Sequence, residues 1–355
     1  MTAVSENRSN TAAPTNNASR ARRRHPAVLV TMIVLLAAGA LLSATLGHYP
    51  LSAGEIVSVL RDPNDPATAD VAQIFYQVRL VRIWAAIMVG AALALAGAAF
   101  QAVFRNPMVS PDVLGASGGA GLGAALGLLF ALGTTTTQTL SFVFGLAAVA
   151  VVFVVDRAVD PRGGSILTLI LTGMVVAALC SALISLVKYV GDPENKLPQI
   201  TFWLLGGLSA VRSVDLIVLG GALLVAGIPL TVLRWRLNAL SFGDDQAQAL
   251  GINVAVVRGT TIAAATLLTA AAVSVAGVVG WVGLIIPHLA RILVGPDNRY
   301  AMPAATLLGA LFLLAVDDVA RSASSIEIPL GVLTALLGAP VFLYLLAAGR
   351  RRGWL

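Results

Sequence analysis

Few side chains in the apolar segments of this 355-residue sequence could take part in chemistry. Asp317 and Asp318 end one apolar run, and His288 follows Pro287 in another. Acidic and histidine side chains inside a membrane are the groups that move protons or ions in coupled carriers. Each also has a structural alternative, because Asp317 lies one helical turn from Arg321 and a histidine at a helix end can bond to free backbone groups. Ion coupling therefore stays open beside a structural role.

Enzyme chemistry finds little support in the sequence. There is no G-x-x-x-x-G-K-[ST] phosphate-binding loop, and the only lysines are Lys188 and Lys196. No HExxH motif, Ser/His/Asp arrangement or pair of catalytic carboxylates stands out. The single Cys180 excludes an intramolecular disulfide and a cysteine metal cluster, and the three histidines are scattered. We expect no metal and no cofactor bound by this chain; ATP and Mg²⁺, if used, belong to a partner.

The composition is that of an integral membrane protein. Hydrophobic residues make up 58% and charged residues 11% of the chain, against about 25% charged residues in soluble domains. The net charge of +6 could suggest nucleic acid as a partner. However, the basic residues lie mostly at the ends of apolar runs, where they act as topology signals. We therefore expect membrane lipid, and no nucleic acid, around this chain.

A polar segment, residues 237–254 (LNALSFGDDQAQALGINV), separates two long apolar runs. Ser241 precedes Asp244 by three residues, which is the spacing of an N-terminal capping box. Asp244 and Asp245 would lie in the first turn, where the helix dipole favours negative charge. Gly251 stands where a left-handed C-terminal cap is expected. The pattern predicts a helix of roughly nine residues, about 13 Å long, which is too short to span a bilayer. The alternative is a solvated loop.

Ten spans account for the apolar runs. Residues 1–25 are polar and end in an arginine cluster, which predicts a disordered basic cytoplasmic tail. Residues 26–355 form one transmembrane domain. The run 260–290 would be about 46 Å long as one helix, so we predict two spans with a turn among Gly277, Gly280, Gly283 and Pro287. The other spans are predicted at 26–47, 83–104, 113–133, 139–155, 165–187, 216–233, 301–316 and 328–348. Residues 51–76 are predicted to be a polar outer segment.

The positive-inside rule favours this topology. With ten spans and a cytoplasmic N-terminus, inward segments hold 16 basic residues and outward segments hold 7. Both termini and the polar segment 237–254 are then cytoplasmic. The glycine-rich run 115–123 could suggest a nucleotide-binding loop, but it lies within a membrane segment without a preceding strand. Close helix packing is the better interpretation.

Taken together, several motifs in order resemble the FecCD-type permeases of ABC importers for ferric siderophores, haem and vitamin B12. The resemblance covers about residues 51–346. Its motifs are RLVR (79–82), RNP (105–107), PDVLG (111–115), TFWLLG (201–206), GDDQAQALG (243–251), GWVGLIIPH (280–288), DDVAR (317–321), EIP (327–329) and GAP (338–340). Two departures stand out: Val81 replaces a proline of the first motif, and Asp318 is an additional acidic residue.

The resemblance implies an all-α permease with ten spans, the type II importer architecture, in the cytoplasmic membrane. It implies a cytoplasmic ABC ATPase dimer, an extracytoplasmic substrate-binding protein and a second permease copy or a paralogue as partners. The implied ATPase-coupling residues are Ser241, Phe242, Gly243, Asp244, Asp245, Gln246, Ala247, Leu250 and Gly251. The residues implied to dock the binding protein are Arg79, Arg82 and Arg321. Those implied in gating or structure are Asn106, Pro107, Pro287, His288, Asp317, Glu327 and Pro340.

The function expected from the resemblance is import of a ferric siderophore by ATP-driven alternating access, without covalent chemistry in this chain. Haem and cobalamin are the alternative cargoes. The alternative from another class is an ion-coupled secondary carrier that works without an ATPase. A membrane-embedded enzyme is a more distant third.

Overall fold

The computed structural model describes residues 16–47, 49, 51–63, 65–159, 166–324 and 326–351, and every regular element within these ranges is a helix. The N-terminal helices are α1 (Asn16–Thr45), α2 (Ala53–Arg61), the 3₁₀ turn η1 (Pro66–Thr68), α3 (Ala69–Gln73), the π-helical turn η2 (Ile74–Arg79), α4 (Leu80–Val103) and the 3₁₀ turn η3 (Pro111–Leu114). The middle helices are α5 (Ala116–Leu129), α6 (Thr134–Val159), α7 (Ile166–Val190), α8 (Lys196–Leu205) and α9 (Ser213–Leu240). The last are α10 (Asp244–Ala249), α11 (Val254–Ala276), α12 (Val282–Val294), α13 (Asn298–Ser322) and α14 (Leu330–Arg351).

Eight helices are long and apolar enough to cross a membrane, and α5 and α12 are shorter apolar helices. Together they correspond to the ten predicted spans. With 14 and 13 residues, α5 and α12 are each about 20 Å long, less than the ~30 Å hydrocarbon core. The predicted break in 260–290 is confirmed, because α11 ends at Ala276 and α12 begins at Val282. The cytoplasmic location of both termini stays a prediction.

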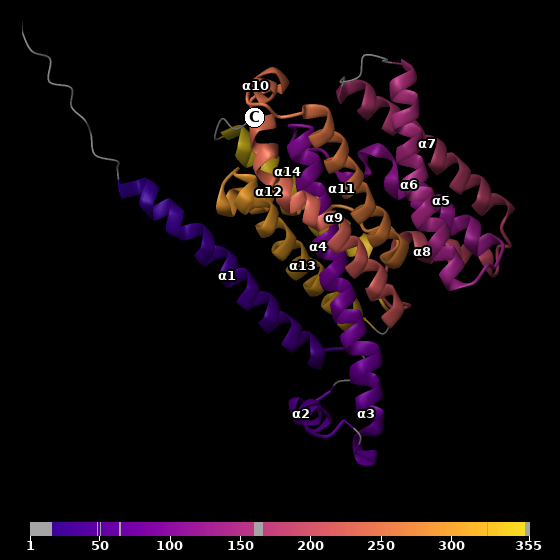
Figure 1. Ribbon diagram of the computed structural model, residues 1–355. Coiled ribbons are helices and arrows are strands. Elements are labelled where there is room, and N and C mark those ends of the chain that lie inside the picture. The colour runs from indigo at the N-terminus through magenta and orange to yellow at the C-terminus, as the bar shows by residue number, and fades with distance from the viewer. Residues whose placement is uncertain are drawn as a thin grey trace, which may run out of the picture.

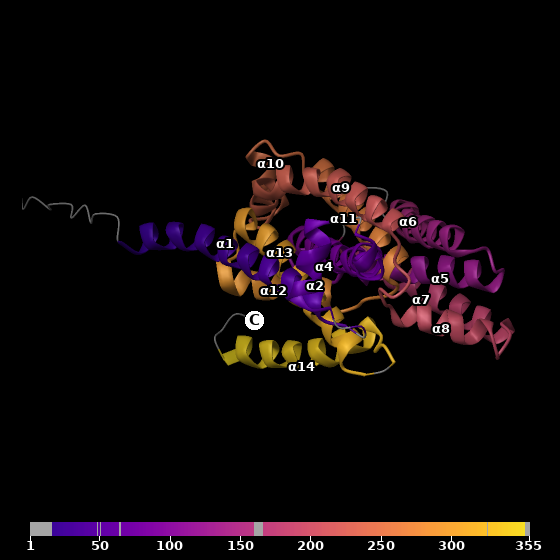
Figure 2. The same ribbon diagram turned by 90° about the horizontal axis from the view of Figure 1, so that it is seen from below.

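Helix α4 lies at the centre of the bundle, with α9, α11, α12 and α13 around it (Figures 1 and 2). Its sequence is rich in alanine and glycine, and nearly all of its side chains are buried. A helix that is apolar on every side belongs inside a protein rather than at its surface. Small residues on α4 therefore let four neighbours approach it closely.

Two glycine pairs bring the backbones of α4 and its neighbours into contact. A Cβ atom added to Gly97 would lie 1.9 Å from the carbonyl oxygen of Gly283 in α12. A Cβ added to Gly90 would lie 2.2 Å from the carbonyl oxygen of Gly309 in α13. In a bilayer, burying apolar side chains between helices gains little free energy, because lipid is equally apolar. Close backbone packing of this kind therefore supplies much of the attraction between the helices. These pairs fix α4 against α12 and α13.

Substituting Gly97 with alanine is expected to disrupt this packing, because the new methyl group meets backbone rather than a movable side chain. We expect a loss of about 1–3 kcal/mol in stability, typical of overpacking, and less folded protein in the membrane. The matched control is Gly220→Ala in α9, where nothing lies within 4 Å of the added Cβ. Thermal unfolding of the detergent-solubilised variants measures both effects, and equal melting temperatures would contradict the prediction.

Helices α1, α7, α9 and α14 lie at the periphery and expose most of their apolar side chains. In Figure 2, α14 runs along one side of the bundle and α1 projects from another. These faces are suited to lipid or to another membrane subunit. The bundle thus has a close-packed centre and outer helices with exposed apolar faces.

The connection between α11 and α12 contains an unusual turn. Trp281 has φ +70° and ψ −32°, and the Val282 N–H donates to the Gly280 carbonyl at 2.9 Å. This is a γ-turn, which is strained for a residue with a side chain. The Trp281 ring packs edge-on against Phe342 of α14, with ring centroids 6.2 Å apart. The predicted turn therefore also anchors α14.

Three predicted segments differ from the structure. The predicted tail reached residue 25, but α1 begins at Asn16, where alanine and arginine favour a helix; residues 1–15 lie outside the described residues. The outer segment 51–76, whose location stays a prediction, contains α2, η1 and α3, and 66–103 is one continuous helical run that extends beyond the predicted span 83–104. Helix α8 was not predicted, because Pro198 and its short apolar stretch gave no helical signal strong enough to separate it from a loop.

Candidate functional site

Helix α10 is a six-residue helix at one end of the bundle (Figure 1). The predicted capping box is wrong: the Ser241 hydroxyl donates to the Asn238 carbonyl at 2.6 Å and so belongs to the end of α9. The N-cap is Gly243, with φ +114° and no side-chain cap. Asp244 and Asp245 do lie in the first turn, and Gly251 has the left-handed φ of +78° expected of a C-terminal glycine. A short helix forms in this segment as predicted, but it has six residues where roughly nine were predicted.

Asp244 fixes α10 to two other elements of the bundle. One carboxylate oxygen accepts from Arg105 Nη2 at 3.0 Å, and the other accepts from Arg258 Nη2 at 2.8 Å. Arg105 follows the end of α4 and has a left-handed φ of +51°, whereas Arg258 is in the first turn of α11. We call Arg105, Asp244 and Arg258 the Asp244 cluster. A carboxylate held by two guanidinium groups positions α10 relative to α4 and α11.

Around this cluster, α10 exposes apolar side chains. Phe242 is 72% and Leu250 68% exposed, one before the helix and one at its end. Asp245 and Gln246 are also exposed, whereas Ala247 is buried against the bundle. Two large exposed apolar side chains beside polar ones are typical of a surface that meets another protein.

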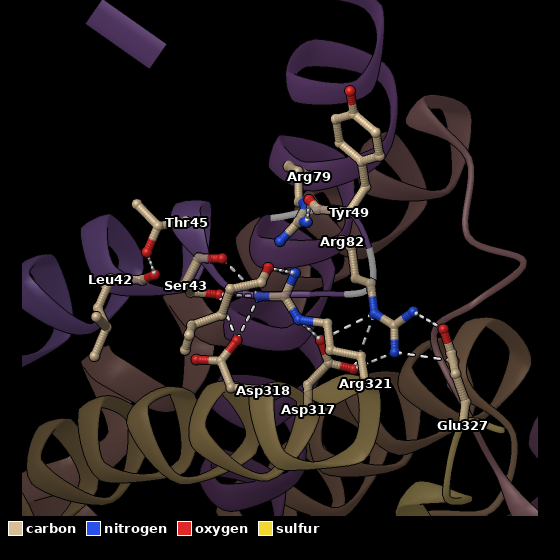
Figure 3. A network of polar contacts seen from close by, with 11 residues as sticks. Leu42, Ser43, Thr45, Tyr49, Arg79, Arg82, Asp317, Asp318, Arg321 and Glu327 are labelled. Carbon is tan, nitrogen blue, oxygen red and sulfur yellow. Dashed lines mark hydrogen bonds and ion pairs between the residues drawn. The ribbon is translucent and has the colours of Figure 1, made fainter. Parts of the chain in front are cut away.

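The opposite end of the bundle carries a group of six charged residues, four of them buried and two half-buried, which we call the Arg82 network (Figure 3). Its members are Arg79, Arg82, Arg321, Asp317, Asp318 and Glu327. Arg82 is central: its Nε and Nη2 donate to both carboxylate oxygens of Asp317, at 2.9–3.1 Å. Its Nη1 donates to Glu327 at 2.7 Å. This bidentate geometry joins α4 to α13 and to the segment before α14.

Arg321 extends the network to α1. Its guanidinium donates to Asp318 and to the carbonyl and hydroxyl groups of Ser43, and also to the Leu46 carbonyl at 3.0 Å. Ser43 in turn donates to Asp318 at 2.7 Å. The Arg321 Nε is 3.7 Å from Asp317, so the predicted alternative of an Arg321–Asp317 pair is present. The network thus ties the end of α1 to α13.

The three arginines predicted to dock a binding protein come together in this network. Arg79, Arg82 and Arg321 are only 4–9% exposed. Arg79 donates to the Tyr49 carbonyl. Side chains this buried cannot reach a second protein without repacking, so their docking role stays a prediction that this arrangement does not favour. Three positive and three negative charges leave the network neutral.

The remaining motif residues have structural positions. The Asn106 side chain accepts from the Met108 N–H at 2.9 Å in the turn after α4, next to Pro107. Pro287 is buried within α12, with His288 half-buried beside it. Pro340 lies inside α14. No group of three metal-ligating side chains occurs in the described ranges.

Comparison with known proteins decides the family. The FecCD transport family matches residues 35–348. The chain belongs to this family. It is a permease subunit of the ABC importer type and a multi-pass protein of the cytoplasmic membrane.

Relatives named for different cargoes share this architecture. The molybdate import permease MolB of Haemophilus influenzae is 40% identical, over 93% of this chain and 98% of its own. The hemin transport permease HmuU of Yersinia pestis is 34% identical over 334 residues, which cover 91% of this chain and 95% of its own. An inward-facing structure of a metal-chelate type ABC transporter is 40% identical, with a TM-score of 0.83 over 91% of this chain and 99% of that one.

Sequence reasoning missed several partners in these sites. Arg105 was noted as part of a motif and, with Arg258, among the basic residues of the inward segments, but neither was considered as a partner of Asp244; Ser43 was not considered. The Arg82–Glu327 pair spans 245 residues of sequence, and nothing local signals such a contact. The sequence did offer a signal for Asp244: an acidic residue in a short polar segment between two apolar runs needs a cationic partner if it is half-buried.

Proposed function

We propose that this FecCD-family permease forms the membrane pathway of a binding-protein-dependent importer for ferric siderophores. The observation that carries the cargo class is the likeness to a metal-chelate type transporter at 40% identity over nearly the whole chain. The relative named for hemin also carries an iron chelate. The secondary-carrier alternative has little support, because Asp317 and Asp318 both lie against arginines rather than in an open pathway.

The ATPase partner is proposed to bind at α10. Phe242 and Leu250 would insert into a groove of the ATPase, while the Asp244 cluster transmits the movement to α4 and α11. ATP hydrolysis takes place in that partner, and this chain contributes alternating access. The extracytoplasmic binding protein is proposed to dock at the far end, where the Arg82 network fixes the ends of α1, α4 and α13.

A second permease subunit is proposed to pack against α7 and α14. Both helices expose rows of large apolar side chains, among them Leu171, Val175 and Leu179 on α7 and Leu336 and Leu343 on α14. A pathway between two subunits needs faces that are not already packed within one of them. The chain composition of the purified complex decides whether the second subunit is a copy of this chain or a paralogue.

Uptake in a deletion strain tests the cargo. We expect loss of uptake of an iron-labelled siderophore and its recovery when the intact gene is restored, with labelled haem and cobalamin unaffected. The matched control is a complementing gene with the Gly220→Ala substitution, which should restore uptake fully. Loss confined to haem or cobalamin would contradict the siderophore assignment while leaving the importer class intact.

Molybdate is a second candidate cargo, because the relative named for it is 40% identical over almost its whole length. The same strains, supplied with labelled molybdate, separate the two. Loss of molybdate uptake with normal siderophore uptake would replace the first assignment by the second.

A further inference from the structure

Helices α9 and α13 form the walls of a cavity of about 580 Å³, which we call the α9–α13 groove. It is lined by one face of α9 (residues 223–234), one face of α13 (residues 302–307) and Leu95 of α4. Ile228 and Val232 in this lining are 59% and 61% exposed, so the groove opens outward from the bundle. Helix α9 lies on the opposite side of the bundle from α14, where the second subunit is proposed to pack (Figure 2). The groove therefore faces lipid.

The groove is apolar along its length. Among the described residues that line it, Thr231 and Thr306 carry the only hydroxyl groups, and each donates to the backbone of its own helix, at 2.7 and 2.9 Å. From Leu223 to Arg234 the α9 wall is about 16 Å long at 1.5 Å per residue, close to half of the ~30 Å hydrocarbon core. These dimensions match one acyl chain of a single leaflet.

Gly227 leaves room for such a chain midway along the groove. A glycine in a membrane helix commonly lets a second backbone approach closely. At Gly227 no backbone does so, because an added Cβ would meet only the Leu95 Cδ2 atom of another helix within 4 Å, at 3.9 Å. The missing side chain widens the groove instead.

A guanidinium group lies at the end of the groove nearest α10. Pro303 has no N–H, so the Arg299 carbonyl, one turn earlier in α13, lacks its helical donor. The Arg234 Nη1 donates to this carbonyl at 3.4 Å, which holds the half-buried Arg234 side chain between α9 and α13. A guanidinium has five N–H donors, and Arg234 forms no ion pair among the described residues. Its other donors are therefore available to an anion.

A second basic residue lies at the same end of the groove. Arg299 precedes Pro303 by four residues and Thr306 by seven, so it lies on the face of α13 that lines the groove, and it is exposed. The nearest carboxylate in the sequence is Asp297, whose Oδ1 accepts from Asn238 Nδ2 at 2.6 Å and from the Arg299 N–H at 2.9 Å. Within the described ranges Asp297 forms no ion pair. Two arginines against one aspartate leave a net positive charge here.

We propose that the α9–α13 groove binds an acidic phospholipid, with its phosphate at Arg234 and Arg299 and one acyl chain along Gly227. Basic pockets between membrane helices bind anionic headgroups by the same attraction. The Asn298 N–H donates to Asn238 Oδ1 at 2.9 Å, so the lipid strengthens a junction at which α9 and α13 already meet beside α10. This inference does not depend on the cargo or on the ATPase partner.

Lipid retention by the full-length permease tests the site. Native mass spectrometry of the detergent-solubilised protein counts bound phosphatidylglycerol, and phosphatidylcholine is the zwitterionic comparison. We expect the wild type to retain phosphatidylglycerol in preference. Arg234→Gln should weaken phosphatidylglycerol binding about fivefold, the contribution of one basic residue to the attraction of an anionic lipid. Gly227→Leu should lose the lipid because its side chain fills the groove.

Each variant has a matched control in α9. Arg236→Gln removes a cation two residues further on, which lies over the Trp235 ring and does not line the groove. Gly221→Leu adds the same side chain as Gly227→Leu at a position where an added Cβ meets nothing within 4 Å. Both controls should retain phosphatidylglycerol as the wild type does. Glycerol phosphate, which has the headgroup chemistry without acyl chains, should not displace the lipid.

Four outcomes would overturn the proposal. The first is equal retention of phosphatidylglycerol and phosphatidylcholine by the wild type. The second is wild-type retention by Arg234→Gln and Gly227→Leu, and the third is displacement of the lipid by glycerol phosphate. The fourth is a disulfide between two Ile228→Cys chains in native membranes, which would show that a second subunit covers the groove. If a variant does not fold, the wild type still decides, because phosphatidylglycerol should raise its melting temperature more than phosphatidylcholine does.

Discussion

Asp317→Asn is expected to lower the stability of this permease more than any other single change considered. Asp317 is 1% exposed and accepts three hydrogen bonds from Arg82. Asparagine keeps the size but removes the charge, so the Arg82 guanidinium stays buried with only Glu327 to balance it. Breaking a buried ion pair from one side costs about 3–5 kcal/mol. We expect little folded protein in the membrane and a melting temperature well below that of the wild type.

The control and the rescue both follow from the network. Glu327→Gln removes the charge of the more exposed partner of Arg82, since the Glu327 side chain is 35% exposed. The loss of stability should be less than half that of Asp317→Asn, because water can replace the Glu327 carboxylate. The double variant Arg82→Met/Asp317→Leu removes both charges and should recover much of the loss, since an apolar pair can replace a buried ion pair. Equal stability of Asp317→Asn and the wild type would show that the pair contributes nothing.

Asp244→Lys is expected to lower transport strongly while leaving the bundle folded. A lysine there would place a third cation beside Arg105 and Arg258, whose nitrogens are now 2.8–3.0 Å from the carboxylate. Repulsion would release α10 from α4 and α11, so movements of the ATPase would no longer reach the central helices. We expect transport to fall by about tenfold or more, the effect of roughly 1.4 kcal/mol or more in coupling.

Asp245→Lys is the comparison that separates the ion pairs from the surface charge, since Asp245 lies exposed on the same proposed ATPase-binding helix, is adjacent in sequence and has no ion pair among the described residues. The measurement is ATPase activity of the reconstituted complex with and without loaded binding protein, together with uptake into the vesicles. If Asp244→Lys and Asp245→Lys lose transport equally, the charge of the helix rather than the Asp244 cluster is responsible. Wild-type transport by Asp244→Lys would reject the coupling role of the cluster.

The features that local sequence patterns predicted correctly are those set by neighbouring residues, namely the spans and the break between two of them. Apolar length and charge located the spans, and the glycines and proline of residues 277–287 marked the break between α11 and α12. Gly251 was predicted correctly because a left-handed residue after a helix favours glycine. The Ser241 capping box failed because α9 continues to Leu240 and the hydroxyl bonds back to Asn238. A spacing of three residues does not reveal to which helix a serine belongs.

The sites themselves depend on contacts that sequence spacing does not encode. Arg79 and Arg82 were expected at the surface because the family resemblance implied that they dock a binding protein. Arg82 is instead buried against Asp317 and Glu327, more than 230 residues away, and Arg79 donates to the Tyr49 carbonyl. The helical run from residue 66 also carries the π-helical turn η2 just before Arg82, which shifts the register of side chains by an amount that a regular helix would not predict.

The glycine contacts of α4 have a consequence for how the transporter can move. Gly97 against Gly283, and Gly90 against Gly309, leave no side chain between the backbones that could change rotamer. Paired spin labels on α4, α12 and α13 should therefore report the same separations in every nucleotide state. Labels that join this unit to α7, α8 or α14 should report separations that change. The cargo would then pass alongside one rigid body of the subunit, and the peripheral helices would do the opening and closing.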